Sequence, residues 1–252
     1  MKASILENSM QRITLIMILL NAFTTPLMLS AVNVAIPSIA DALSLNAVLL
    51  CWIPMAFLTA SAMFVLIFGR IADMIGRKKI FLIGTSSVIV TSIIASFVDN
   101  GIALITARFF QGVSAAMLYA TQVAIISSVF PPEKRGYAIG LTVSAIYFGL
   151  TAGPLIGGYV VDLYGWRASF LVHLPLALTA LIIGVLYVKD EWLSEERGSF
   201  DIFGAILYMI SIFIICLGVS FLPSSLSFIL ILFALSGLTF FFFFENKHKH
   251  PI

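Results

Sequence analysis

Long apolar stretches alternate with short polar breaks along the whole chain. Eight of these stretches have about the 20 residues, or more, that a helix needs to cross a bilayer. The breaks contain charged residues, Gly or Pro. The first stretch exceeds the core of a signal peptide, and no small-residue cleavage site follows it, so it is kept as a helix. The pattern predicts eight transmembrane helices over residues 13–37, 48–68, 79–98, 101–129, 137–160, 168–188, 202–221 and 226–244.

Composition supports this picture. The chain of 252 residues is 61% hydrophobic and 10% charged, with a mean hydropathy of +1.10, whereas soluble domains are about 45–50% apolar and about 25% charged. Cys51 and Cys216 each stand alone in or beside an apolar stretch, which favours small packing residues over a metal site or a thiol enzyme. We therefore expect an all-α integral membrane protein that is not an enzyme, with no catalytic residues, metal or cofactor.

The basic residues predict the orientation of these helices. Because cytoplasmic loops are enriched in Lys and Arg, the side with most basic residues is taken as cytoplasmic, with both termini on it, in a multi-pass protein of the cell membrane. Arg167 lies on the opposite side and Arg108 within a helix. The net charge of +2 thus reflects topology and gives no reason to expect nucleic-acid binding. The cytoplasmic set is Lys2, Arg12, Arg70, Arg77, Lys78, Lys79, Lys134, Arg135, Lys189, Arg197, Lys247 and Lys249.

A sequence repeat divides the chain. The stretch "GRIADMIGRKKIF" at residues 69–81 is matched by "GYVVDLYGWRASF" at 158–170, three helices later. Because three is odd, the two copies lie on opposite sides of the membrane, as in an inverted-topology repeat. The expected domains are a six-helix 3+3 bundle (1–188), a cytoplasmic linker (189–201), a two-helix hairpin (202–244) and a polar tail (245–252). The matched residues are Gly69, Asp73, Gly76, Phe81 and Leu82 with Gly158, Asp162, Gly165, Phe170 and Leu171.

Five motifs in order point to a known family. They are "VNVAIPSI" (32–39), "GRIADMIGRKKIF" (69–81), "RFFQGVSAA" (108–116), "GLTAGPLIGG" (149–158) and "SFDIFGAIL" (199–207). On these motifs the chain resembles the major facilitator superfamily, and within it the drug:proton antiporters with fourteen helices. The resemblance covers the whole chain, which corresponds to the N-terminal bundle and the two linking helices of such a transporter; six further helices would be expected.

The resemblance implies a conformational latch between helices 2 and 3. Its residues are Gly69, Asp73, Gly76 and Arg77, which in this family join the two halves in the outward-facing state. The partner half is not encoded here, so we expect only one side of the latch.

Arg108 is the charged residue that lies inside a predicted helix, and an intramembrane charge is a functional hypothesis by default. The alternative is a side chain that reaches back to the membrane boundary. Gln111 shares its face one turn on and can hydrogen-bond a substrate or Asn33. The resemblance implies that Arg108, with Gln111, Gly112 and Asn33, belongs to the central cavity and to proton coupling.

Glycines at a spacing of four mark helix 5. Gly149, Gly153 and Gly157, with Gly158, surround Pro154. Small residues let helices approach closely, and a proline bends a helix, so close packing alone explains the pattern. The resemblance implies more, namely a bend that seals the cavity on one side during antiport.

One position departs from the family. Met28 stands where the fourteen-helix exporters commonly have an acidic residue in helix 1, and the chain's acids fall at loops or helix ends. His173 titrates in a useful range, but a hydrogen-bonded residue at a helix end is the favoured interpretation.

The leading hypothesis is therefore a major facilitator transporter that exports drugs or other small molecules by proton antiport. Its expected partners are the lipid bilayer, an amphipathic organic substrate, protons, and either a second six-helix half or a second copy. The alternative is a truncated or split transporter half that is inactive alone and acts as an assembly partner or remnant.

Overall fold

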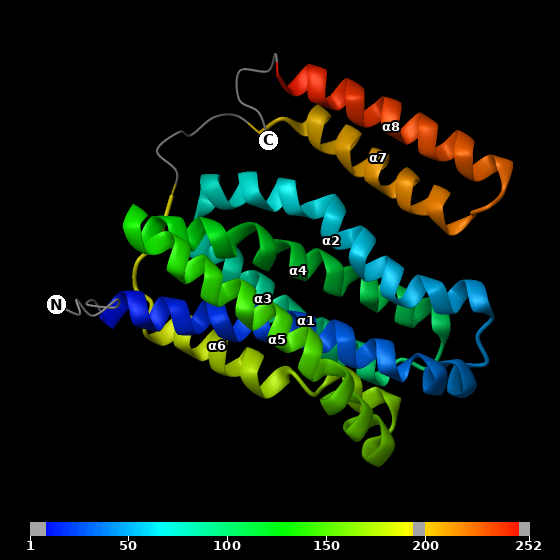
Figure 1. Ribbon diagram of the computed structural model, residues 1–252, viewed down its shortest axis with the longest axis horizontal. Helices are drawn as coiled ribbons and strands as arrows, with labels where there is room; N and C mark the ends of the chain where they lie inside the picture. Colours follow the sequence, from blue (N-terminus) through cyan, green and yellow to red (C-terminus); the bar gives the residue numbers. More distant parts are fainter. Residues whose placement is uncertain (1–8, 194–199, 247–252) are drawn as a thin grey trace.

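The computed structural model describes residues 9–193 and 200–246. These residues form eight helices long and apolar enough to cross a membrane, counting the 3-10 turn η1 with α6, which confirms the predicted all-α membrane architecture (Figure 1). Parts of the predicted linker and tail, including Arg197, lie outside the described residues. The elements are α1 (Ser9–Leu43), α2 (Ala47–Ile75), α3 (Arg77–Phe97), α4 (Gly101–Val129), α5 (Pro132–Tyr164), η1 (Trp166–Phe170), α6 (Leu174–Leu186), α7 (Ile202–Ser220) and α8 (Ser225–Glu245).

Several helices extend beyond the apolar stretches that predict them. The α2 helix continues through Asp73 to Ile75, so the loop expected between helices 2 and 3 is reduced to Gly76. The sixth span begins as η1, and its α-helical part starts only after His173, with proline in its first turn. Asn46 and Asn100 begin α2 and α4 by accepting hydrogen bonds from backbone N–H groups three residues on, as expected of N-caps.

The first six spans pack into one bundle, and the hairpin of α7 and α8 lies beside α2 (Figure 1). The most extensive interhelical packing joins α1 to α5 and α2 to α4. The hairpin is tied to the bundle by the Tyr208 hydroxyl, which donates to the Ala62 carbonyl at 2.9 Å.

The inverted repeat is visible in the backbone. Gly76 and Gly165 are the two glycines with positive φ among the described residues, at +120° and +79°. Each N–H donates to the carbonyl four residues earlier at 2.9 Å, so each ends a helix in the same way. In the repeat, α1 corresponds to α4 and α2 to α5. The packing of α1 against α5 therefore corresponds to the packing of α4 against α2.

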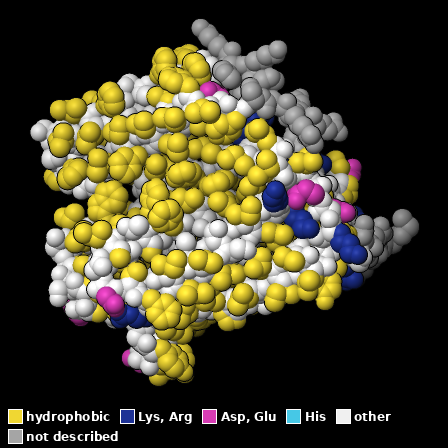
Figure 2. Space-filling view, turned by 180° about the vertical axis from the view of Figure 1, so that it is seen from behind, with side chains coloured by type: hydrophobic (Ala, Val, Ile, Leu, Met, Phe, Trp, Pro, Cys, Tyr) yellow, Lys and Arg dark blue, Asp and Glu magenta, His cyan; other side chains and the backbone are white. Residues whose placement is uncertain are grey.

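Charge separates the two ends of the bundle. The Arg77 end contains Gly76, the α4–α5 connection and the residues after α6; the Arg167 end contains the connections at 44–46 and 98–100. Figure 2 shows hydrophobic side chains along the helices, with Lys and Arg gathered mainly at one end. Such an apolar girdle is typical of a protein surrounded by lipid.

Candidate functional site

Arg108 is fully buried in the bundle, with 0% of its surface exposed. Its Nε donates to the Ile53 carbonyl at 3.3 Å and its Nη1 donates to Gln111 Oε1 at 2.7 Å. The guanidinium carbon lies 4.6 Å from the centroid of the Phe57 ring, within the range of a cation–π contact. The alternative that Arg108 reaches back to the membrane boundary is therefore wrong.

Further hydrogen bonds connect the Arg108–Gln111 pair to Ser92 and His173 across the bundle. Gln111 Nε2 donates to Ser92 Oγ at 2.8 Å, and Ser92 Oγ lies 3.3 Å from His173 Nε2. Both Ser92 and His173 have 0% of their surface exposed. The hydrogen-bonded, helix-end role expected of His173 is thus confirmed, and its partner joins it to Arg108. We call Met28, Ser92, Arg108, Gln111 and His173 the Arg108 cluster.

Met28 lies in the middle of this cluster. Its Sδ is 3.6 Å from Gln111 Nε2 and 3.7 Å from Ser92 Oγ. A thioether sulfur is a weak acceptor, so a neutral group lies where an acidic residue is common in the family. Asn33 does not join the cluster: it is exposed, and the Gln111 amide donates to Ser92 and Met28 instead. Of the two partners considered for Gln111, Asn33 is therefore not in contact with it in this structure.

Two polar atoms of the cluster have no partner. Arg108 Nη2 and His173 Nδ1 are both buried without a hydrogen bond. Buried polar groups are normally satisfied, so each is a place where water or a polar ligand atom gains by binding. The Arg108 cluster can therefore hold a polar group inside a membrane-spanning bundle.

Gly112 helps to place Arg108. A Cβ at this position would overlap the Phe57 carbonyl oxygen and lie 2.8 Å from Ala60 Cβ. Because glycine lets α4 approach the α2 backbone this closely, the Arg108 side chain, one turn away, can reach the Ile53 carbonyl and the Phe57 ring.

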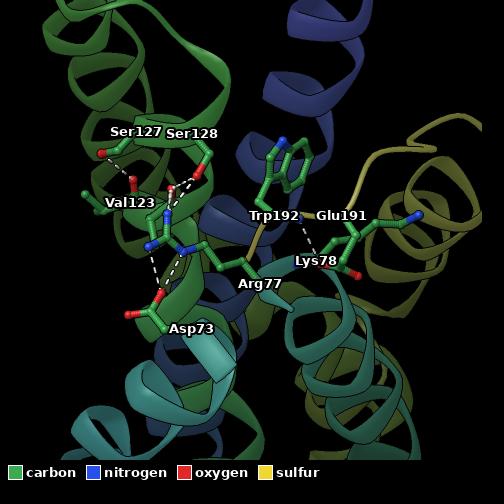
Figure 3. Close-up of polar contacts among 9 residues, drawn as sticks. Asp73, Arg77, Lys78, Val123, Ser127, Ser128, Glu191 and Trp192 are labelled. Carbon is green, nitrogen blue, oxygen red and sulfur yellow. Dashed lines mark hydrogen bonds and ion pairs between the residues drawn. The ribbon is translucent and has the colours of Figure 1, made fainter. Parts of the chain in front are cut away.

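The second group of predicted residues lies at the corner between α2 and α3 (Figure 3). Asp73 Oδ1 accepts from Arg77 Nε at 2.8 Å and lies 2.7 Å from Nη2. Arg77 Nη1 donates to the Ala124 carbonyl at 3.1 Å and to Ser128 Oγ at 2.7 Å. In this structure Arg77 therefore joins Asp73 on α2 to α4 of its own bundle; a contact between this corner and a second half stays a prediction.

Glycines at this corner differ in what surrounds them. A Cβ at Gly69 would meet nothing within 4 Å, so packing does not explain that residue. A Cβ at Gly76 would lie 2.6 Å from Glu191 Cδ. Glu191 and Trp192, which follow α6, both bind this corner, although from the sequence their segment is expected only to be a linker.

The helix 5 motif is a packing surface toward α1. Cβ atoms at Gly149 and Gly153 would overlap the Phe23 carbonyl and the Ser30 side chain, and one at Gly157 would lie 2.6 Å from Ala31 Cα. Gly158 is not part of this surface, since its Cβ would be 3.8 Å from Val34. Pro154 lies inside a continuous α5.

Ser92 and Glu191 are the functional candidates that sequence reasoning missed. Serine is common in apolar helices, and its place beside His173 depends on a contact between residues 81 positions apart. Glu191 stands in a charged segment that looks like any loop, and its partner is 113 positions away.

The fold and the buried cluster define an all-helical, multi-pass membrane protein built on an inverted repeat. A family model described as the Major Facilitator Superfamily matches residues 18–243. The chain belongs to this superfamily.

Relatives with known names agree with the family. The chain is 32% identical to the riboflavin transporter RibZ of Clostridioides difficile over 78% of its own length and 43% of that protein. It is 33% identical to the multidrug resistance protein Stp of Mycobacterium tuberculosis (strain CDC 1551 / Oshkosh), over 81% of its length and 38% of that protein.

The fold is shared with a solved structure as well. A crystal structure of the peptide transporter POT in complex with sulfate matches with a TM-score of 0.61 at 16% identity, covering 70% of this chain and 37% of that one. The chain thus spans less than half the length of these relatives.

Proposed function

We propose that this chain provides the N-terminal bundle and linking hairpin of a transporter that exports amphipathic organic molecules by proton antiport. Membership in the superfamily and relatives named as riboflavin, multidrug and actinorhodin transporters support this function. The observation that favours it most is the Arg108 cluster, because a buried, incompletely paired cation in a membrane bundle has no structural need to be there.

The proposal assigns roles to three groups. Arg108, with Gln111 and Gly112, takes part in transport coupling from inside the bundle, and Asp73 and Arg77 act as the latch that holds one conformation. The glycine surface of α5 lets α1 and α5 move as a tight pair.

Partners and location follow the same argument. The chain lies in the cell membrane with its Arg77 end in the cytoplasm, as the distribution of Lys and Arg supports. Since its relatives are more than twice as long as the aligned part, a second six-helix half or a second copy completes the pathway.

Transport by inside-out membrane vesicles tests the proposal. Vesicles containing the chain are energised and supplied with a fluorescent lipophilic cation, and we expect uptake that a protonophore abolishes. Arg108→Ala is expected to reduce uptake at least tenfold. Uptake equal to that of vesicles without the chain, despite its presence in the membrane, would contradict transport by this chain alone.

A further inference from the structure

The segment after α6 lies across the corner between α2 and α3 (Figure 3). Glu191 Oε1 accepts from the backbone N–H of Lys78 at 2.9 Å, and the Trp192 carbonyl accepts from the N–H of Arg77 at 2.9 Å. The Trp192 side chain packs against the hydrophobic core of the bundle. The first two N–H groups of α3 therefore donate hydrogen bonds to a segment that lies more than a hundred residues later in the chain.

The α3 helix lacks a cap of its own. Its N-cap residue is Gly76, which has no side chain to offer, and the first N–H groups of any helix have no partner within it. Anionic groups at this end are also favoured by the helix dipole. Glu191 supplies both the acceptor and the negative charge that a local Asp or Ser would normally provide.

Gly76 leaves the space that this contact needs. A Cβ on residue 76 would lie 2.6 Å from Glu191 Cδ and 2.7 Å from Glu191 Oε1. At Gly165, the counterpart in the repeat, a Cβ would meet nothing within 4 Å. Both glycines have positive φ, so the backbone alone does not distinguish them; the Glu191 contact is particular to the corner that contains Arg77.

We propose that Glu191 is a positioning residue for the latch, and that Glu191 and Trp192 form a brace across it. Glu191 and the Trp192 carbonyl fix the backbone at Arg77 and Lys78. With its backbone fixed, Arg77 directs its guanidinium to Asp73 on α2 and to Ser128 on α4. The role in transport rests on the proposed function; the bracing contact does not.

Amide hydrogen exchange of the full chain in detergent tests the brace without reference to transport. In Glu191→Ala we expect exchange at Arg77 and Lys78 to become about fivefold faster, the effect of losing a typical helix cap. In Glu191→Gln the exchange rate is expected to lie between those of the wild type and Glu191→Ala, because the amide oxygen of Gln still accepts a hydrogen bond. Asp190→Asn is the matched control: it removes the same charge one residue away, where no polar contact is made, and exchange is expected to stay unchanged. Equal exchange in Glu191→Ala and wild type, or an equal effect of Asp190→Asn, would overturn the brace.

The link to the latch needs a second measurement. In the vesicle assay, Glu191→Ala is expected to lower the maximal rate about threefold or more and leave the apparent KM unchanged, because Glu191 acts through Arg77 and not on the substrate. Combined with Arg77→Ala, it should lower the rate no further than Arg77→Ala alone. Additive effects would overturn the positioning role. If the wild-type chain transports nothing, the proposed function fails, while hydrogen exchange still decides whether Glu191 positions Arg77.

Discussion

The guanidinium of Arg108 shows how one residue can be held as a buried cation. Its partners are neutral: the Ile53 carbonyl, the Gln111 amide and the Phe57 ring. A buried charge without a carboxylate is costly and depends on every hydrogen bond it makes. Changes in the neighbours of Arg108 are therefore expected to act on stability as well as on transport.

Ser92→Ala tests this dependence. The change removes the acceptor of Gln111 Nε2 and the neighbour of His173 Nε2, and leaving buried polar groups unpaired costs about 1–3 kcal/mol. We expect the temperature of heat-induced aggregation in detergent to fall by several degrees, about 2–4 °C per kcal/mol. Ser96→Ala is the control, because Ser96 is also buried on α3 but donates only to a carbonyl of its own helix. Equal losses in both variants would show that the cluster contributes no stability.

Part of the Arg108 cluster is predictable from the sequence. Arg108 and Gln111 are three residues apart on a helix, a spacing that puts two side chains on one face, and their hydrogen bond follows from it. Ser92 and His173 could not be found in this way, because only the packing of three elements brings them together. The same reasoning could not decide whether Asn33 meets Gln111, since periodicity does not say which face of α1 meets α4.

At the scale of elements, the pairing of α1 with α5 depends on a row of glycines. The spacing of four predicted the row, but the structure shows that Gly149, Gly153 and Gly157 form it and that Gly158 lies beside it. Helix ends were harder to predict: polar residues such as Asp73 ended the apolar stretch, whereas the helix continued to Ile75. There the polar groups are satisfied by ion pairing, which hydropathy does not register.

Comparing Gly149→Ala with Gly140→Ala separates the effect of helix packing on stability from that of helix propensity. A Cβ at this position would overlap the backbone carbonyl of Phe23, which cannot move aside easily, so we expect α1 and α5 to separate. Gly140→Ala, in the same helix, would meet nothing within 4 Å and is expected to be neutral or to stabilise by up to about 1 kcal/mol, since alanine favours a helix. Thermal stability in detergent measures both. A Gly149→Ala variant as stable as Gly140→Ala would contradict the close contact.

At the scale of the whole molecule, the hairpin of α7 and α8 is joined to the bundle through α2. The contact is made by α7 against α2. Across it the Tyr208 hydroxyl donates a hydrogen bond to the Ala62 carbonyl. The sequence placed the hairpin by its two apolar stretches but could not say which helix it would contact.

Tyr208→Phe is expected to loosen the hairpin without unfolding it. Phenylalanine keeps the ring contact with Phe241 and removes the hydroxyl, at a cost of about 1 kcal/mol. Amide exchange in α7 should become about fivefold faster, whereas exchange in α1 should not change. Tyr164→Phe, which removes an exposed hydroxyl at the end of α5, is the control. Unchanged exchange in α7 would mean that apolar packing alone holds the hairpin.

The orientation of the molecule in the membrane gives the last prediction. The α5 helix has 33 residues, which at about 1.5 Å per residue is about 50 Å, longer than the roughly 30 Å hydrocarbon core. Its two ends therefore reach water on opposite sides.

Glu133→Cys and Tyr164→Cys place one exposed thiol at each end of α5, in a chain whose Cys51 and Cys216 are replaced by serine. Because most of the basic residues lie at the Arg77 end, the end of α5 that contains residue 133 is expected in the cytoplasm. In intact cells, an impermeant maleimide should label the thiol at position 164 and should reach the one at position 133 only after permeabilisation. The opposite pattern would reverse the proposed orientation and place the α2–α3 corner, with Arg77 and its Glu191 brace, outside the cell.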